Sequence, residues 1–405
     1  MSRSRSMSLR EKAIKSLKKI HKYYRYKIYF PRLYKKYCRE AVHADKVLFL
    51  EMRFEEISHS FHYLRDRLEE SGDYELSEAF VRFNFARGRD YTEKVKHALK
   101  EIASSRFVFV DDSSIILSCI PLRQETTVIN LWHACGAFKK FGRSTATKIF
   151  GDTADELERY PNYENLDLVT VSSPEVVWAY EEAMHLPEGI VQPLGISRTD
   201  YFYDQEFVAG RKAKLYEAMP QARDRKVILY APTFRGRVST ATSPDEIDFI
   251  RMKELFGEEY VLVCKLHPFV KDHPQIPEEA SDFAMDAEGT GLTIEDLLCC
   301  ADICISDYSS LVFEYSLFEK PMIFYAFDYD DYCDWRGFYY DYPEFTPGPI
   351  VRTQEELFQA IRDCSDHFDP SLVIAFKKRF MDSCDGHATE RIISYMKKKQ
   401  LDENI

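Results

Sequence analysis

The chain has 405 residues, of which 45% are hydrophobic, 14% aromatic and 30% charged, with a net charge of −12. These are the values of a soluble globular protein long enough for two domains, and they exclude a disordered chain. No apolar run approaches the ~18 residues that cross a bilayer, and no apolar stretch follows the basic N-terminus as in a signal peptide. Ten Cys residues without a CxxC pair indicate buried, reduced thiols and not a zinc site.

Residues 1–40 form a basic arm, with fourteen Lys or Arg and two Glu for a net charge of +12, so residues 41–405 carry −24. Steps of three and four residues place five apolar side chains on one face of a predicted helix: Ile14, Leu17, Ile20, Tyr24 and Ile28. Four lysines point elsewhere: Lys15, Lys18, Lys19 and Lys22. Such a helix suits an anionic membrane surface. A terminal helix docked on its own body is the alternative, and Pro31 should end the helix or start a second piece.

An alternating α/β pattern follows the arm, and the acidic body argues against nucleic-acid binding. The first half predicts helices over 55–70, 92–103 and 174–182, and apolar strands over 46–52, 79–83, 107–110, 127–132, 168–171 and 191–194. The turn-rich stretch 194–200 then marks a domain boundary. We therefore expect a first domain over 41–204 after the arm at 1–40.

The alternation restarts in the second half, which we expect to form a second domain over 205–405 with a helical tail from 354. Strands are predicted over 226–231 and 260–266, and helices over 245–256 and 293–300. The segment 301–315 reads as a buried strand, a hydroxyl-rich turn and an amphipathic helix, and 320–325 starts another apolar run. Two doubly wound α/β halves facing a cleft are the predicted architecture, with ligands beyond the carboxyl ends of the strands.

The turn Asp307-Tyr308-Ser309-Ser310 is the first candidate site. Ser309 and Ser310 can cap the helix that follows and leave free N–H groups at its partly positive end, which favours phosphate. Glu314, in the first turns of that helix, could receive hydroxyls of a ribose or an alditol, or simply favour the helix dipole. An ordinary strand–helix–strand unit with a Ser cap is the alternative.

Three further strand ends carry polar side chains. His133 follows a strand and precedes small residues, so its imidazole could act as a general base in a cleft, although a lone His is more often structural. Thr233 and Arg235 end the strand over 226–231, and Arg can hold a phosphate through two hydrogen bonds. Lys265 and His267 are two residues apart on an extended chain, so they should face the same side and meet a pyrophosphate.

These elements, in this order, resemble the CDP-glycerol glycerophosphotransferase family of teichoic acid synthesis, over roughly residues 105–395. The matching pieces are Trp132-His133, Ala231-Pro232-Thr233, Lys265-Leu266-His267-Pro268, Ser306-Asp307-Tyr308-Ser309-Ser310 with Glu314-Tyr315, Lys320-Pro321, Arg336-Gly337-Phe338, Pro347-Gly348-Pro349, and Asp385-Gly386 with Ala388. Many members read His-Gly-Thr-Pro where this chain reads His133-Ala134-Cys135-Gly136. The resemblance implies a GT-B arrangement of two Rossmann-like domains and peripheral attachment to the cytoplasmic face of a bacterial cell membrane.

The resemblance also implies the reaction, in which an alditol phosphate passes from CDP-glycerol or CDP-ribitol to a hydroxyl of an undecaprenyl-linked glycan and CMP leaves. The family's two functional His residues fall on His133 and His267. His133 is then the expected base, and the pyrophosphate is expected to be held from the second domain by His267, Lys265, Arg235, Ser309 and Ser310, with Thr233, Asp307 and Glu314 also in the substrate site. These groups could replace a metal, and no cofactor is expected. The acidic stretch 328–331 is interpreted as a solvated loop.

Two other functions stay open at this point. A GT-B glycosyltransferase would use the same phosphate site and attack a sugar carbon. A non-catalytic membrane scaffold would need no converging His, Lys and Arg at strand ends. The sequence alone does not choose glycerol from ribitol, or a single added unit from a polymer.

Overall fold

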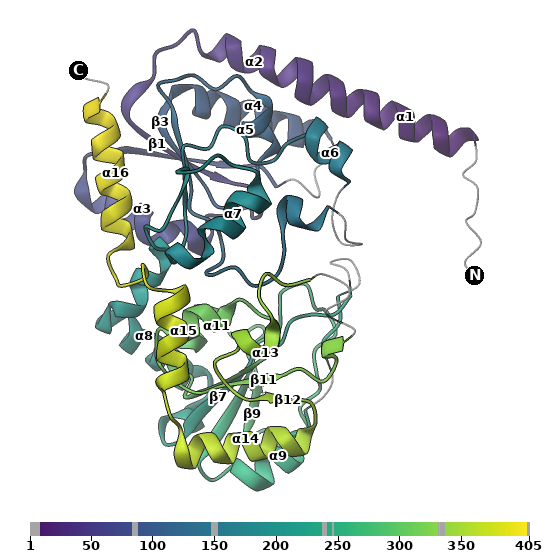
Figure 1. Ribbon diagram of the computed structural model, residues 1–405, viewed down its shortest axis with the longest axis vertical. Coiled ribbons are helices and arrows are strands. Elements are labelled where there is room, and N and C mark those ends of the chain that lie inside the picture. The colour runs from purple at the N-terminus through teal and green to yellow at the C-terminus, as the bar shows by residue number, and fades with distance from the viewer. Residues whose placement is uncertain are drawn as a thin grey trace.

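The computed structural model describes residues 9–82, 88–146, 153–236, 241–244, 247–330, 332 and 337–402, with side chains from Ile14 onward. Within these ranges the chain forms two six-stranded sheets whose neighbouring strands are all parallel. The two sheets lie in separate halves of the molecule, one above the other in Figure 1. The predicted α/β class with two doubly wound halves is confirmed.

The first sheet has the strand order β2-β1-β3-β4-β5-β6. Its strands are β1 (His43–Glu51), β2 (Glu75–Phe80), β3 (Ser105–Val110), β4 (Thr127–Asn130), β5 (Leu168–Thr170) and β6 (Val191–Gln192). The helices of this half are α3 (His59–Ser71), α4 (Arg89–Ser104), α5 (Ile115–Cys119), α6 (Ala154–Arg159) and α7 (Val177–Met184). The order reverses between β1 and β3, and ligands of open parallel sheets bind at the carboxyl ends of the strands beside such a reversal.

The second sheet has the order β12-β11-β10-β7-β8-β9, so its reversal lies between β7 and β10. Its strands are β7 (Lys226–Tyr230), β8 (Tyr260–Cys264), β9 (Ala284–Asp286), β10 (Ile303–Ser306), β11 (Met322–Tyr325) and β12 (Ile350–Val351). The helices of this half are α8 (Gln205–Ala218), α9 (Phe249–Phe256), α10 (Ile294–Cys300), α11 (Leu311–Ser316), α13 (Tyr342–Phe345), α14 (Gln354–His367) and α15 (Ser371–Phe380). A 3₁₀-helix, η4 (Ser197–Tyr203), connects the two halves.

The last helix, α16 (Ala388–Asp402), returns to the first sheet. Its Ile392 and Met396 are fully buried in the core beneath that sheet. The Arg106 guanidinium at the start of β3 donates a 2.9 Å hydrogen bond to the carbonyl of Lys399. The tail was expected to belong wholly to the second domain, and α16 departs from that expectation because its apolar face covers the first sheet. The boundary near residue 204 stays a prediction.

The arm is one long helical stretch that changes register. It consists of α1 (Leu9–Tyr23), a π-helical segment (Tyr24–Tyr29) and α2 (Phe30–Tyr37), with Pro31 in the first turn of α2. Proline lacks the N–H for a regular helical bond and crowds the carbonyl four residues earlier, which explains the wider π turn before it. The helix therefore continues past Pro31 as a second piece, one of the two predicted outcomes.

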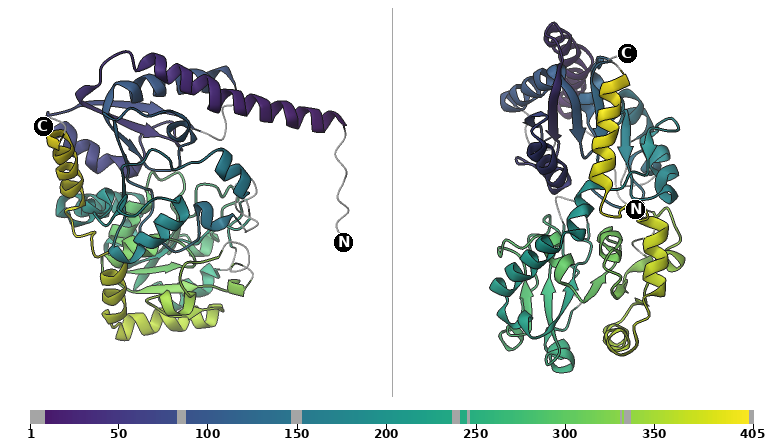
Figure 2. Two further views of the ribbon diagram at one scale, coloured as in Figure 1. Left: turned by 45° about the horizontal axis from the view of Figure 1, so that its top comes forward. Right: turned by 90° about the vertical axis from the view of Figure 1, so that its left-hand side faces the viewer.

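The two ends of the arm have different surroundings. Tyr26, Phe30 and Tyr34 are buried against the first domain. In contrast, α1 projects from the body in Figures 1 and 2, and its Leu17 and Ile20 are each 65% exposed. Within the described ranges, no helix combines the length and apolar character needed to cross a membrane.

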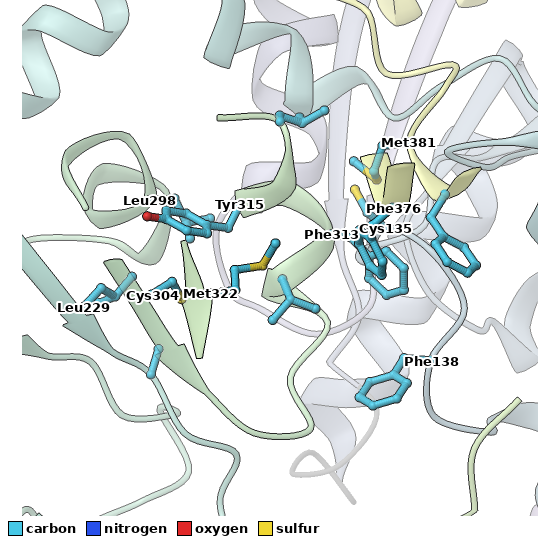
Figure 3. Close-up of a cluster of buried hydrophobic side chains, with 14 of the residues drawn as sticks. Cys135, Phe138, Leu229, Leu298, Cys304, Phe313, Tyr315, Met322, Phe376 and Met381 are labelled. Atoms are coloured by element: carbon cyan, nitrogen blue, oxygen red, sulfur yellow. The ribbon is translucent and has the colours of Figure 1, made fainter. Parts of the chain in front are cut away.

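One hydrophobic core joins the two halves. Cys135 and Phe138, on the chain after β4, pack in the same cluster as Phe313, Phe376 and Met381 of the second half, as Figure 3 shows. A short antiparallel bridge between Lys139 and Phe338 continues this contact. The segment 133–140, which follows β4, is therefore held directly against the second half.

Candidate active site

His133 lies just beyond the carboxyl end of β4, on a sharp turn. Trp132 has a φ of +54°, a left-handed conformation that L-residues rarely adopt. The Oδ1 atom of buried Asn130 stabilises this turn by accepting a 2.8 Å hydrogen bond from the Trp132 N–H. Strained backbone of this kind is typical of functional positions.

The tautomer of His133 is fixed by its neighbour Asp111. Nδ1 lies 2.8 Å from the Asp111 carbonyl oxygen, which can only accept, so Nδ1 carries the proton and Nε2 keeps a free lone pair. Removal of the ring from water lowers the pKa of His133, and Arg53 adds to this while Asp112 and Asp111 oppose it. The imidazole is therefore neutral near pH 7, the form that a general base needs.

His267 has the opposite tautomer. The Phe269 N–H donates to Nδ1 over 3.2 Å, so in the neutral ring the proton resides on Nε2. The ring packs against Phe234 and Phe269, with ring centroids 4.9 and 4.5 Å away. This desolvation, together with the charge of Lys139, lowers the pKa of His267 to about 4, although the residue as a whole stays exposed. His267 is therefore a neutral hydrogen-bond donor and not a cation.

Thr233 and Asp307 lie at the reversal of strand order in the second sheet and bond to each other there. The Thr233 N–H donates a 2.8 Å hydrogen bond to Asp307 Oδ1, which links the chain after β7 to the chain after β10. Thr233 is 7% exposed, and its hydroxyl has no partner among the described residues. A buried hydroxyl without a partner at this position is a candidate ligand contact.

Arg235 is already paired with carboxylates. Its Nη2 lies 2.9 Å from Asp307 Oδ2, while Nε and Nη2 donate to Asp328 at 2.5 and 2.9 Å. Burial favours the neutral guanidine, but Asp307 and Asp328 outweigh it and raise the pKa of Arg235. A phosphate would have to displace one carboxylate, so Arg235 more readily shapes the loop at Asp307 than binds the donor.

Ser309, Ser310 and Lys265 are partly buried beside this reversal. Ser309 Oγ accepts only a long 3.4 Å bond from the Leu311 N–H, and among the described residues Ser310 at the N-cap makes no capping bond. Lys265 Nζ donates to the Leu292 carbonyl at 2.9 Å, so it contacts a different segment from the aromatic neighbours of His267. The expectation that Lys265 and His267 together meet a pyrophosphate stays a prediction.

Glu314 forms a buried ion pair between the connecting segment and α11. Arg198, in η4, donates to Glu314 Oε1, and the two side chains are only 10% and 8% exposed. The second carboxylate oxygen, Oε2, is buried and has no partner in the described part of the chain. A direct contact of Glu314 with a ribose or alditol hydroxyl thus stays a prediction that has to compete with this pair.

Comparison with known proteins decides the family. The family model described as CDP-Glycerol:Poly(glycerophosphate) glycerophosphotransferase matches residues 33–398. The chain belongs to this family. The predicted family and the predicted transferase class are thereby confirmed.

Individual members agree with this assignment. The chain is 36% identical to the teichoic acid ribitol-phosphate primase of Bacillus spizizenii over 363 residues, which are 88% of this chain and 91% of the primase. It is 34% identical to the teichoic acid poly(ribitol-phosphate) polymerase of the same species, but covers only 58% of that protein. A variant of the wall teichoic acid polymerase TagF shares the fold, with a TM-score of 0.74 at 20% identity over 98% of this chain and 99% of that chain.

The residues that sequence reasoning missed lie in the first domain and its connection to the second. The Asp111 carbonyl holds His133, Arg53 pairs with Asp111 and Asp112, and Arg198 holds Glu314. The signal for Asp111 and Asp112 was available, because they directly follow a predicted strand as the other site residues do. In the part of the chain that the structure describes, no three His, Cys, Asp or Glu side chains are grouped as metal ligands. Asp331 and Arg336 lie outside the described residues.

Proposed function

We propose that this enzyme transfers an alditol phosphate from a CDP-alditol to a hydroxyl of a lipid-linked glycan and releases CMP. The structural observation that supports this most directly is the pair of opposite tautomers: His133 offers a free lone pair on Nε2, and His267 offers an N–H on Nε2. One is suited to take a proton and the other to donate a hydrogen bond.

The proposed chemistry is a single displacement at phosphorus. His133 Nε2 takes the proton of the acceptor hydroxyl as that oxygen attacks the phosphorus next to the alditol. The bond from this phosphorus to the bridging oxygen breaks, and CMP leaves with that oxygen and its electron pair. Such a step depends mainly on positioning and on stabilising phosphate charge.

The donor pyrophosphate is proposed to bind at the reversal of the second sheet. His267, the unpartnered Thr233 hydroxyl, and the side chains of Ser309 and Ser310 are neutral donors there, and Lys265 adds a positive charge. Arg235 and Asp307 then serve chiefly to shape this loop, because they already pair with each other. TagF has been solved after a soak with CDPG, which agrees with a CDP-alditol as the ligand of this fold.

Similarity favours ribitol as the alditol. Four relatives with ribitol phosphate in their names are 33–36% identical to the chain, whereas two glycerol-phosphate primases are 30% identical. We therefore propose a CDP-ribitol donor.

The test is CMP release from labelled CDP-ribitol, CDP-glycerol and nucleotide sugars, each with and without a lipid-linked glycan acceptor. The proposal requires acceptor-dependent CMP release that is fastest with CDP-ribitol. His133→Ala should lower turnover by ~10²–10⁴-fold with unchanged donor affinity, whereas His267→Ala should weaken donor binding. Release of a nucleoside diphosphate from a nucleotide sugar would instead show a glycosyltransferase.

We also propose that the arm attaches the enzyme to the cytoplasmic face of an anionic membrane. The supporting features are the +12 charge of residues 1–40 and the exposed Ile14, Leu17 and Ile20 on the projecting α1. Each basic side chain near such a surface adds ~1 kcal/mol, which salt screens. Lys22 is left out of the test below, because it pairs with Glu156 at 2.5 Å.

Co-sedimentation with vesicles tests the attachment. Lys15→Glu, Lys18→Glu and Lys19→Glu together should release the protein from anionic vesicles, and binding of the unaltered chain should weaken as salt rises. A matched triple change at lysines near the opposite terminus (Lys397, Lys398 and Lys399) should leave it bound. Equal pelleting of both triple variants would show that α1 is not the attachment site.

A further inference from the structure

The reversal of the first sheet holds charged side chains to which the proposed function gives no role. Arg53 follows β1, and Asp111 and Asp112 follow β3, so all three lie at the carboxyl ends of the two neighbouring strands between which the strand order reverses. Arg53 Nη2 lies 2.5 Å from Asp111 Oδ2, which also accepts a 2.8 Å hydrogen bond from the Ser58 hydroxyl. This is the position at which an open parallel sheet presents its functional groups.

The network fixes the backbone that holds the base. The side chain of Asp111 is anchored by Arg53 and Ser58, and the main-chain carbonyl oxygen of Asp111 accepts a hydrogen bond from the N–H at His133 Nδ1. Asn130 Nδ2 donates to the next carbonyl, that of Asp112, at 3.3 Å. The imidazole is therefore tied to the ends of both β3 and β4, and its orientation depends on the Arg53–Asp111 pair.

The same residues place one guanidinium, that of Arg53, and two carboxylates, those of Asp111 and Asp112, close enough to act on the ring. Asp112 Oδ2 is 3.7 Å from Arg53 Nε, a weak pair that leaves both groups able to act on a third. We infer that Asp112 and Arg53 are opposed positioning residues for His133: Asp112 stabilises the imidazolium that forms as the acceptor hydroxyl loses its proton, and Arg53 keeps the resting imidazole neutral. This inference rests on the proposed role of His133 as the base.

The other groups that face this cluster are consistent with the inference. Burial and then Asp111 raise the pKa of Glu51, whose carboxylate accepts hydrogen bonds from the N–H groups of Arg53, Phe54 and Ser58. Burial and then Asp112 raise the pKa of Tyr163. Of the charges near His133, Asp112 acts on its pKa most strongly, followed by Arg53 and then Asp111.

The experiment is the pH profile of kcat/KM for acceptor-dependent CMP release. Asp112→Asn removes the stabilising negative charge, so the acid limb should move to lower pH, by roughly one unit for a single nearby charge. Arg53→Met keeps the length of the side chain and removes the positive charge, so the limb should move to higher pH. The KM for the CDP-alditol should change in neither variant.

Matched controls separate this role from a structural one. Arg53→Lys and Asp112→Glu keep the charges and should return the limb towards its original position. Arg251→Gln and Glu355→Gln break an exposed 2.6 Å ion pair on the second domain and should leave the profile unchanged. Circular dichroism of each variant establishes that it is folded.

Opposite shifts in Asp112→Asn and Arg53→Met support the inference, and shifts in one direction or none overturn it. If Arg53→Met does not fold, Arg53→Lys and Asp112→Asn still decide: an unmoved limb in Asp112→Asn refutes the inference. Normal turnover by folded His133→Ala would refute the proposed base itself. Loss of turnover in His133→Ala with unmoved limbs would refute only the role of Asp112 and Arg53.

Discussion

The buried Arg198–Glu314 pair yields a quantitative prediction about stability. Both side chains are at most 10% exposed, and Glu314 Oε2 has no other partner among the described residues. Arg198→Met would leave this carboxylate buried with neither oxygen paired to a cation, which costs about 3–5 kcal/mol. That is a large part of the ~5–15 kcal/mol that stabilises a typical native protein. Because desolvation of two charges nearly offsets their attraction, the double change Arg198→Met with Glu314→Leu should recover most of the loss.

Chemical denaturation followed by circular dichroism measures this as a double-mutant cycle. The exposed pair of Lys226 and Glu259, 2.6 Å apart and each about half exposed, is the matched control, and Lys226→Met should cost less than about 1 kcal/mol. Isothermal titration with the CDP-alditol adds a second readout: if Glu314 also binds the donor, the double variant is stable but binds weakly. A loss below about 1 kcal/mol in Arg198→Met would refute the reasoning.

Three further predictions concern the site. Gly136→Ala should destabilise the protein by about 2–4 kcal/mol in urea unfolding, because Gly136 has a φ of +62° and a Cβ there would lie 2.2 Å from the ring of Phe313. Adding Phe313→Leu should relieve part of this loss. An unchanged free energy of unfolding in Gly136→Ala would contradict so close an approach of the two segments. With a pKa of about 4 for His267, donor affinity should show no pH dependence from this group between pH 8 and 5.5 and should rise only as pH falls towards 4. A step near pH 6.5 that His267→Gln removes would argue against a neutral ring. Thr233→Val should weaken CDP-alditol binding by about 1–2 kcal/mol without lowering stability, since the hydroxyl has no partner in the described protein; unchanged affinity in calorimetry would place the donor elsewhere.

The fold was predictable where the sequence pattern is strong. Continuous apolar runs such as 107–110 indicated the buried central strands, because parallel strands covered on both faces need no polar alternation. The short edge strands β9 and β12 were missed, since two or three residues carry no periodic signal. Helix α8 was missed for a related reason: it buries only Leu215, so its sequence has no apolar stripe.

The site was predictable as a set of strand ends but not as a set of contacts. Polar residues directly after apolar runs identified His133, Thr233 and Asp307, because parallel strands bring their carboxyl ends to one edge. The pairing of Arg235 with Asp328, 93 positions later, depends on which loops meet in three dimensions. No local sequence pattern predicts which loops meet. The neighbours that set the tautomers of His133 and His267 could not be predicted for the same reason.

The return of α16 to the first sheet also bears on how the chain folds during synthesis. A domain that is contiguous in sequence can close its core as soon as its own residues leave the ribosome. Here Ile392 and Met396 fill the core beside β1 and β3, so the first domain waits for residues made long after its last strand, β6 (Val191–Gln192). Until α16 has been made, only α3, through Phe61, Leu64 and Leu68, covers this face of the first sheet in that core. Truncation before α16 should therefore destabilise the first domain, although that domain lies at the opposite end of the sequence. A partner protein fused after α16 has to leave this helix able to pack on the first sheet.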